Sequence, residues 1–179
     1  MSLLPLVYAP NKIFQEKALP VEKVDDEIRE LIDDMFETLY FEQAVGIGAN
    51  MVGILRRIAI VDMYEDGKPN PYVFINPEIT YRSKETQTFE EASICYRGIS
   101  AKITRPSSIK VKYLDKEGKN QELEANGFFA SVIQHEIDYL DGKVYLDYLS
   151  KMKRDMLLKK MDKYIKMHPP HIHSASCNH

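Results

Sequence analysis

Hydrophobic side chains recur every three to four positions between residues 25 and 41, and this spacing predicts an amphipathic helix. Its apolar positions are Ile28, Leu31, Ile32, Met35, Phe36 and Leu39. Acidic residues at its start suit the N-terminal end of a helix dipole, and its acidic face is expected to meet solvent. The first twenty residues contain Pro5, Pro10 and Pro20, so we expect irregular or extended chain there.

Short apolar or alternating runs in the middle of the chain predict strands. They cover residues 58–61, 72–75 and 109–113, and residues 122–125 are expected to return as a hairpin partner after a turn at 115–118. The second run is expected to end at Asn76-Pro77. Residues 44–53 are rich in glycine and other small residues, which predicts a tightly packed turn before the first strand.

Two further helices are predicted in the last third of the chain. Asn126 is a candidate N-cap for the first, and Gly142 is well placed at its C-terminal cap. The buried stripe of this helix is Phe129, Val132, Ile133, Ile137 and Leu140. The second covers residues 150–167, where apolar residues at helical spacing face seven basic residues. Its apolar positions, expected to be core or docking contacts, are Met152, Met156, Leu157, Met161 and Ile165.

Composition and charge place the chain among ordinary soluble globular proteins. It has 179 residues, 44% hydrophobic and 28% charged, with a net charge of -3, which suits one domain and argues against a DNA-binding or disordered protein. The only cysteines are Cys95 and Cys177, and no signal peptide or membrane-spanning run is evident, so we expect a cytoplasmic protein without a disulfide framework or membrane partner. We assign residues 1–167 to the domain and residues 168–179 to a polar, histidine-rich tail that we expect to be disordered.

The predicted helix over residues 126–140 carries most of a metallohydrolase motif. A helical His-Glu-x-x-His places two imidazoles on one face to share a metal ion, with the glutamate as general base. Residues 134–142 supply His135 and Glu136, but Tyr139 stands where the second histidine belongs.

Three segments, in this order along the chain, resemble the motifs of peptide deformylases. That family carries a Gly-x-Gly-x-Ala-Ala-x-Gln loop, a Glu-Gly-Cys-Leu-Ser segment and a Gln-His-Glu-x-Asp-His-Leu-x-Gly helix. The matching stretches here are residues 44–51, 91–95 and 134–142, with support from Asn76-Pro77, Arg105-Pro106 and the turn at 113–118. The resemblance implies a single α+β domain, in which antiparallel strands surround a central motif helix and a C-terminal helix follows.

The resemblance also implies a chemistry, which is hydrolysis of the N-formyl group from N-formylmethionyl peptides. In the family, Fe²⁺ or Zn²⁺ is held by the cysteine and both histidines, the glutamate handles the proton, and the loop glutamine and an N–H after the cysteine stabilise the oxyanion. Carried over, His135 is the retained ligand, and Glu136, the Ile94 N–H and Met51 are the catalytic positions. Ser93 and Tyr139 stand at the other two ligand positions. By the same analogy, the substrate pocket is lined near Val45, Gly46, Phe89, Glu91, Phe128, Ser131 and Val132.

These replacements are expected to weaken the metal site. A thiol ionises readily at a metal, whereas a serine hydroxyl does not and a phenol titrates near pH 10. Loss of one oxyanion donor typically costs roughly a hundredfold in rate, so Met51 would impair even a metallated site, and Ser100 replaces an arginine common in the family. We therefore interpret the chain as deformylase-like, with the reaction lost or strongly impaired and a pocket left for peptide N-termini.

Other interpretations stay open from the sequence. An active hydrolase could use an altered site of His135, Tyr139 and a repositioned Cys95, but a strand would place Cys95 about 7 Å from Ser93 unless a bulge intervened. His135 could instead be a core histidine bonded to Tyr139 one turn along. The basic residues of the last helix most simply meet solvent, but they could also bind RNA, a membrane surface or the ribosome. Those residues include Lys151, Lys153, Lys159 and Lys160.

Overall fold

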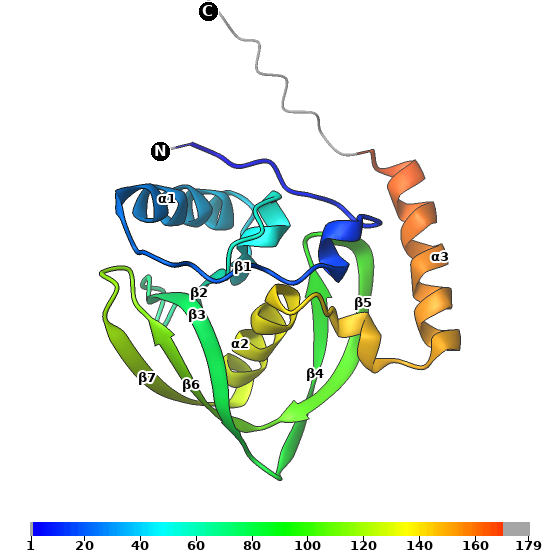
Figure 1. The fold of residues 1–179 in the computed structure, drawn as a ribbon. Coiled ribbons are helices and arrows are strands. Elements are labelled where there is room, and N and C mark those ends of the chain that lie inside the picture. Colours follow the sequence, from blue (N-terminus) through cyan, green and yellow to red (C-terminus); the bar gives the residue numbers. More distant parts are fainter. Residues whose placement is uncertain (1, 170–179) are drawn as a thin grey trace, which may run out of the picture.

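One helix stands at the centre of the molecule, with strands on both sides of it and further helices outside (Figure 1). The computed structural model describes residues 2–169. Its helices are α1 (Asp26–Phe41), α2 (Gly127–Leu140) and α3 (Lys151–Met167), with 3-10 turns at Lys12–Gln15, Ala49–Val52 and Tyr145–Tyr148. Its strands are β1 (Gly46–Gly48), β2 (Ile58–Asp62), β3 (Pro71–Arg82), β4 (Thr86–Ser93), β5 (Tyr96–Pro106), β6 (Ser108–Leu114) and β7 (Asn120–Asn126).

The strands form two antiparallel sheets. The larger has the order β1-β2-β3-β6-β7, and the smaller is the β4-β5 hairpin. The predicted hairpin is confirmed as β6-β7, in which Val111 pairs with Leu123 across a turn at Asp115. Together with the helices, these sheets confirm the α+β fold class.

Strand β3 is longer than the sequence predicts, because it does not stop at Asn76-Pro77. Asn76 adopts a positive φ of 51°, and the pairing with β6 shifts register between Ile75 and Glu78. At this irregularity the Asn76 side chain accepts from the Val21 N–H and donates to the Val21 carbonyl, both at 2.8 Å. The expected end of the strand is therefore wrong, since a bulge absorbs the two residues that normally break a strand.

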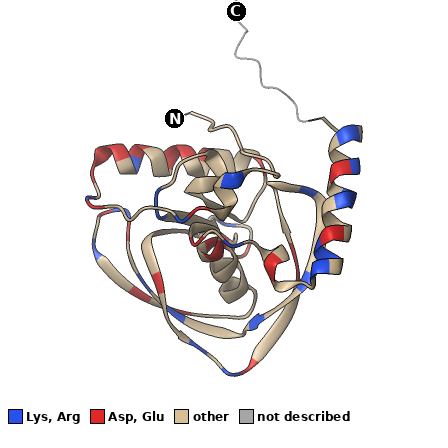
Figure 2. Cartoon of the chain, turned by 45° about the vertical axis from the view of Figure 1, so that its right-hand side comes forward, with Lys and Arg blue, Asp and Glu red and all other residues tan. Residues whose placement is uncertain are grey.

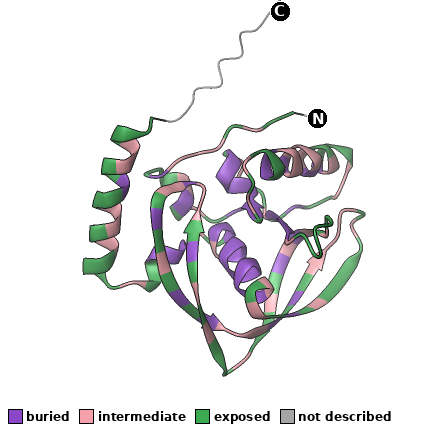
Figure 3. Ribbon diagram, turned by 180° about the vertical axis from the view of Figure 1, so that it is seen from behind, coloured by how far each residue is buried: buried purple, intermediate pink, exposed green. Residues whose placement is uncertain are grey.

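Helix α2 is confirmed, and it is almost entirely buried (Figure 3). It packs against the larger sheet through Val132, Ile133 and Ile137, which share a core cluster with Phe74 and Val111. Asn126 precedes it in extended conformation, but its side chain makes no capping hydrogen bond. Gly142 follows the helix end with a φ of 75°, the left-handed conformation that favours glycine. Burial on all sides means that the polar side chains of α2 must find partners within the protein.

The two outer helices differ in charge, as Figure 2 shows: α1 is mainly acidic and α3 mainly basic. Asp25 caps α1 by accepting from the Ile28 N–H at 3.0 Å, and Ile32, Met35 and Leu39 are fully buried. Helix α3 packs on β5 and buries Met161, but Met152 and Met156 are 76% and 64% exposed. Of the two expected roles, core or docking contacts, Met161 is a core contact, whereas Met152 and Met156 are not, because the first turns of α3 present them to solvent.

Residues 12–15 form a 3-10 turn capped by Asn11, so the N-terminal stretch is more ordered than its prolines suggest.

Within residues 2–169, none of the helices is long and apolar enough to cross a membrane. Apart from residues 168 and 169, the histidine-rich tail lies outside the described residues.

Candidate functional site

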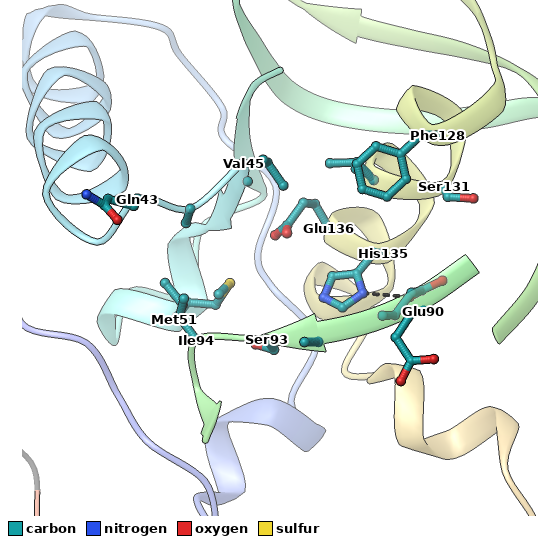
Figure 4. A pocket seen from close by; sticks show the side chains of 15 residues that line it. Gln43, Val45, Met51, Glu90, Ser93, Ile94, Phe128, Ser131, His135 and Glu136 are labelled. Atoms are coloured by element: carbon teal, nitrogen blue, oxygen red, sulfur yellow. Dashed lines mark hydrogen bonds and ion pairs between the residues drawn. The ribbon is translucent and has the colours of Figure 1, made fainter. Parts of the chain in front are cut away.

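A pocket of about 360 Å³ opens where the chain between α1 and β1 meets the end of β4 and one face of α2 (Figure 4). Eleven of the thirteen site residues expected from the sequence line it; Phe89 and Tyr139 do not. The eleven are Val45, Gly46, Met51, Glu91, Ser93, Ile94, Phe128, Ser131, Val132, His135 and Glu136. Phe89 lies just behind the wall, where its ring meets that of Phe128 at a centroid distance of 5.4 Å.

His135 is held by a carboxylate and not by Tyr139. Its Nδ1 lies 2.8 Å from Oε1 of Glu91. Arg105 donates to both oxygens of the same carboxylate, from Nε to Oε2 at 2.7 Å and from Nη2 to Oε1 at 2.9 Å. Burial alone would raise the pKa of Glu91, but the hydrogen bonds from His135 and Arg105 keep that pKa below its ordinary value. His135 is thus hydrogen-bonded inside the core, as the alternative interpretation has it, but its partner is Glu91 and not Tyr139, whose ring centroid lies 5.4 Å from that of His135.

Sequence reasoning missed the outer part of this network. Nη1 of Arg105 donates to Oδ2 of Asp138 at 2.8 Å, and the Tyr148 hydroxyl donates to the same oxygen at 2.8 Å. Arg105 is buried on β5, and Asp138 lies one helical turn after His135. The available signal is the pairing rule for buried charge, because a carboxylate beside a histidine in a core needs a cation, and Arg105 can supply it.

Glu136 lies at the inner end of the pocket and is only 4% exposed. Its Oε2 is shielded from solvent and has no hydrogen-bond partner. Figure 4 shows the carboxylate among Val45, Met51 and His135. Burial raises the pKa of Glu136 from 4.5 to about 7, an effect that His135 partly offsets and Glu91 adds to. Glu136 therefore holds a proton more readily than an exposed glutamate does.

Ser93 and Tyr139 are bonded to each other at the two positions where the family resemblance expects metal ligands. The Tyr139 hydroxyl donates to Oγ of Ser93 at 2.6 Å, and Tyr139 is completely buried. Burial, reinforced by nearby Cys95, raises the pKa of the Tyr139 phenol well above 10. Helix α2 and the end of β4 are thus joined directly by a hydrogen bond between two neutral side chains.

This arrangement does not fit a catalytic Fe²⁺ or Zn²⁺ centre. Such a site normally needs three good protein ligands, and here a single imidazole stands beside a serine and a phenol that resists ionisation. Across residues 2–169, no group of three or more His, Cys, Asp or Glu side chains is arranged to hold a metal ion.

Cys95 cannot replace Ser93 in the way considered from the sequence. The strand β4 ends at Ser93, and Ile94-Cys95 form the two-residue turn into β5, so the assumption of one continuous strand is wrong. A register shift does occur between Glu91 and Ser93, but Cys95 points into the core with 0% exposure and does not line the pocket. Burial also raises the pKa of its thiol, which disfavours the thiolate that a metal requires.

The remaining replaced positions have structural partners. Met51 lies almost completely buried beside the pocket, and its Sδ accepts from the Gly48 N–H at 3.2 Å. Ser100 donates to Oε1 of Glu90 at 2.6 Å on the β4-β5 hairpin. Neither side chain offers the amide or cationic donor that the resemblance would place there.

Comparison with known proteins agrees with the motif order. The sequence model of the polypeptide deformylase family matches residues 3–155. A "peptide deformylase-like" protein of Rickettsia conorii is 61% identical over 97% of this chain and 95% of its own length, and "peptide deformylase 1" of the same organism is 41% identical over 91% and 97%. The crystal structure of peptide deformylase from Ehrlichia chaffeensis superposes with a TM-score of 0.88 at 38% identity, covering 93% of this chain and 98% of that one.

Proposed function

Because the chain belongs to the polypeptide deformylase family, we propose that it keeps the family's peptide-binding pocket but does not carry out metal-dependent deformylation. The observation that carries this proposal is the 2.6 Å hydrogen bond from Tyr139 to Ser93. In this bond, the two side chains at the expected ligand positions satisfy each other's hydrogen-bonding groups. Without the ion, no water with a pKa near 7 is available for Glu136 to activate.

The shape and lining of the pocket support a role in binding. Val45, Phe128 and Val132 give it apolar walls that suit a methionine-like side chain, and its volume of about 360 Å³ is within the range of small-ligand sites. The network of Glu91, Arg105 and His135 is complete, so the inner wall is rigidly held.

The names of the relatives are consistent with two separate roles. Rickettsia conorii has one protein named peptide deformylase-like and another named peptide deformylase 1, and this chain is more similar to the first. The proposal therefore assigns deformylation in such a cell to the second kind of protein, and recognition of a methionyl N-terminus to the first.

The test compares metal content, turnover and binding in the same preparations. Iron and zinc per chain are measured in the full-length protein and in a version lacking residues 170–179, whose histidines could hold adventitious metal. Formate release and calorimetric binding are then measured with a formyl-methionyl tripeptide and its free-amine form. We expect no stoichiometric metal in the shortened protein, no formate release, and measurable binding of at least one of the two peptides.

A variant that restores the family's residues provides the matched control. Ser93→Cys combined with Tyr139→His replaces the bonded hydroxyl pair by a thiol and an imidazole beside His135, and we expect it to take up about one metal ion per chain. Adding Met51→Gln should then permit measurable turnover. Stoichiometric metal and formate release in the unaltered protein would overturn the proposal in favour of an active hydrolase with an altered site.

A further inference from the structure

The outward face of α3 carries three exposed methionines. Met152, Met156 and Met167 are 76%, 64% and 77% exposed, whereas Met161 on the same helix is buried. Counted at about 100° per residue, the three exposed methionines fall within about 60° of one another around the helix axis, and Met161 lies opposite them. They therefore form one apolar ridge, on the side of α3 turned away from its buried contacts.

Five exposed lysines accompany this methionine ridge. By the same count around the helix, two lie on one side of the ridge, two lie on the other, and one lies among the methionines. In that order they are Lys159 and Lys166, Lys153 and Lys160, and Lys163. Among the described residues, none of the five forms an ion pair with a carboxylate, so their ammonium groups are available to an outside partner.

The charge of the chain is divided unequally between α3 and the rest. Seven basic and two acidic residues give α3 a net charge of +5, and because the whole chain has -3, the remaining residues carry -8. Figure 2 shows this division in the colours of the acidic α1 and the basic α3. A negatively charged surface attracts the basic helix and repels the acidic remainder, so it would orient the molecule with α3 towards it.

The methionines indicate which kind of anionic surface fits. RNA meets lysines with its phosphates, and apolar side chains at the crest of the helix gain nothing from that contact. A helix that lies on an anionic bilayer uses both kinds of side chain, since lysines meet the headgroups while apolar side chains enter the boundary with the acyl chains. Helix α3 is straight and stands on the outside of the molecule, so a flat surface can meet the methionine ridge along its length (Figure 1).

A second copy of the chain suits this face less well. Its acidic helix α1 is the complementary surface in charge, but Asp26 and Asp33 are already paired with Arg29 and Lys116 of their own chain. Breaking those pairs would offset part of the attraction to α3.

We propose that α3 docks on the surface of an anionic phospholipid bilayer, with the methionine ridge at the acyl boundary and the five lysines at the headgroups. The assignment is independent of the proposed function, because no residue of α3 lines the peptide pocket. It replaces the expectation that the chain has no membrane partner, which rested on the lack of a spanning run, since a helix lying in the interface needs no such run. It also gives Met152 and Met156 the docking role considered from the sequence.

The experiment is sedimentation of the full-length protein with vesicles of phosphatidylcholine alone or of phosphatidylcholine and phosphatidylglycerol in equal amounts. It is run at about pH 8, where an ordinary histidine is neutral, and at about 0.1 M salt. Each lysine near an anionic surface is worth about fivefold in binding. We therefore expect the anionic vesicles to bind the protein at least about tenfold more strongly than the neutral ones.

Two double variants separate the contribution of charge from that of apolar contact. Lys160→Gln with Lys163→Gln should weaken binding to the anionic vesicles by about tenfold or more. Met152→Gln with Met156→Gln leaves the net charge unchanged and should weaken binding by about tenfold, because two apolar side chains become polar. All four positions are exposed, and glutamine has nearly the helix propensity of lysine and methionine, so α3 should be retained, as circular dichroism would verify.

The matched control removes the same charge elsewhere. Lys110→Gln with Lys112→Gln changes two exposed lysines of β6, which lies across the molecule from α3 (Figure 1), and should alter binding by less than about twofold. A tryptophan reporter tests contact directly, because the chain contains no tryptophan. In Met156→Trp, anionic vesicles should shift the emission to shorter wavelength, and brominated lipid should quench it. Tyr81→Trp, at an exposed position of β3, should show neither effect.

The other possible partners of this face are results that would contradict the assignment. Equal binding to neutral and anionic vesicles, or binding to neither, overturns it. A methionine double variant that binds anionic vesicles as tightly as the unaltered protein also overturns it, because charge alone would then account for the binding, as it would for RNA. A dimer that the lysine double variant disrupts in ultracentrifugation would assign the face to a second copy instead. None of these measurements involves a peptide, so the proposed function is tested separately.

Discussion

Replacing Tyr139 with phenylalanine removes one hydroxyl group and tests whether the bond to Ser93 has become a structural link between α2 and β4. The Tyr139 ring is fully buried and packs against Phe14, so the variant keeps its packing and loses only the donor. Oγ of Ser93 still accepts from the Cys95 N–H at 3.2 Å, and no acceptor is left unsatisfied. We therefore expect Tyr139→Phe to lower the free energy of unfolding by about 1 kcal/mol.

The partner variant Ser93→Ala should cost more. It leaves the Tyr139 hydroxyl without an acceptor at a fully buried position and also deprives the Cys95 N–H of its partner. An unsatisfied buried donor costs about 1–3 kcal/mol. The double variant should cost less than the sum of the two single variants, by a coupling energy of about 0.5–1.5 kcal/mol.

Urea unfolding followed by far-ultraviolet circular dichroism measures all four proteins of this cycle. In thermal scans, each kcal/mol should correspond to about 2–4 °C in Tm for a chain of this length. An additive cycle, or a Tyr139→Phe variant at least as stable as the unaltered protein, would refute the inference that this bond stabilises the site in place of a metal.

Three further predictions concern the same site. Arg105→Met removes the guanidinium that pairs with the Glu91 and Asp138 carboxylates, and it should lower the free energy of unfolding by about 3–5 kcal/mol in urea titrations. Gly46→Ala places a Cβ 2.8 Å from Oε1 of Glu136, so calorimetry should show weaker peptide binding, and unfolding should be easier by about 1–3 kcal/mol. Burial raises the pKa of Glu136 from 4.5 to about 7, so between these values the folded protein retains a proton that the unfolded chain releases. The free energy of unfolding should therefore fall as pH rises from about 4 to about 8. In the Glu136→Gln variant this fall should be smaller by about 3 kcal/mol.

The sequence predicts the helices and the β6-β7 hairpin well because their signals are local. Helix α1 has a complete apolar stripe and a capping aspartate, and α2 lies between recognisable end signals. Strand β3 is harder to predict, because its continuation past Asn76 depends on two hydrogen bonds to Val21, which lies 55 residues earlier in the chain. No local pattern contains that contact.

The candidate site divides along the same line. Short motifs predict which residues meet around the pocket, since α2, the segment at 43–46 and the end of β4 each carry their own motif. They do not predict the side-chain pairing, because Arg105 reaches Glu91 and Asp138 through the pairing of β4 with β5. The turn at Ile94-Cys95 is hard to predict for a different reason. Neither glycine nor asparagine marks it, so the segment has no local signal that separates it from a continuous strand.

Glu136 shows how the replacement of neighbouring residues changes the surroundings of one that is retained. Beside a divalent ion, a glutamate is stabilised as a carboxylate and can take a proton from the metal-bound water. Ser93 and Tyr139 are hydrogen-bonded to each other and do not suit such an ion, while burial raises the pKa of Glu136 to about 7. Ionising a carboxylate at a buried position without a cation beside it is unfavourable, so Glu136 holds its proton more strongly than an exposed glutamate would. The retained glutamate of the motif is therefore not by itself a sign of hydrolysis, because the ligands that would keep it ionised have been replaced.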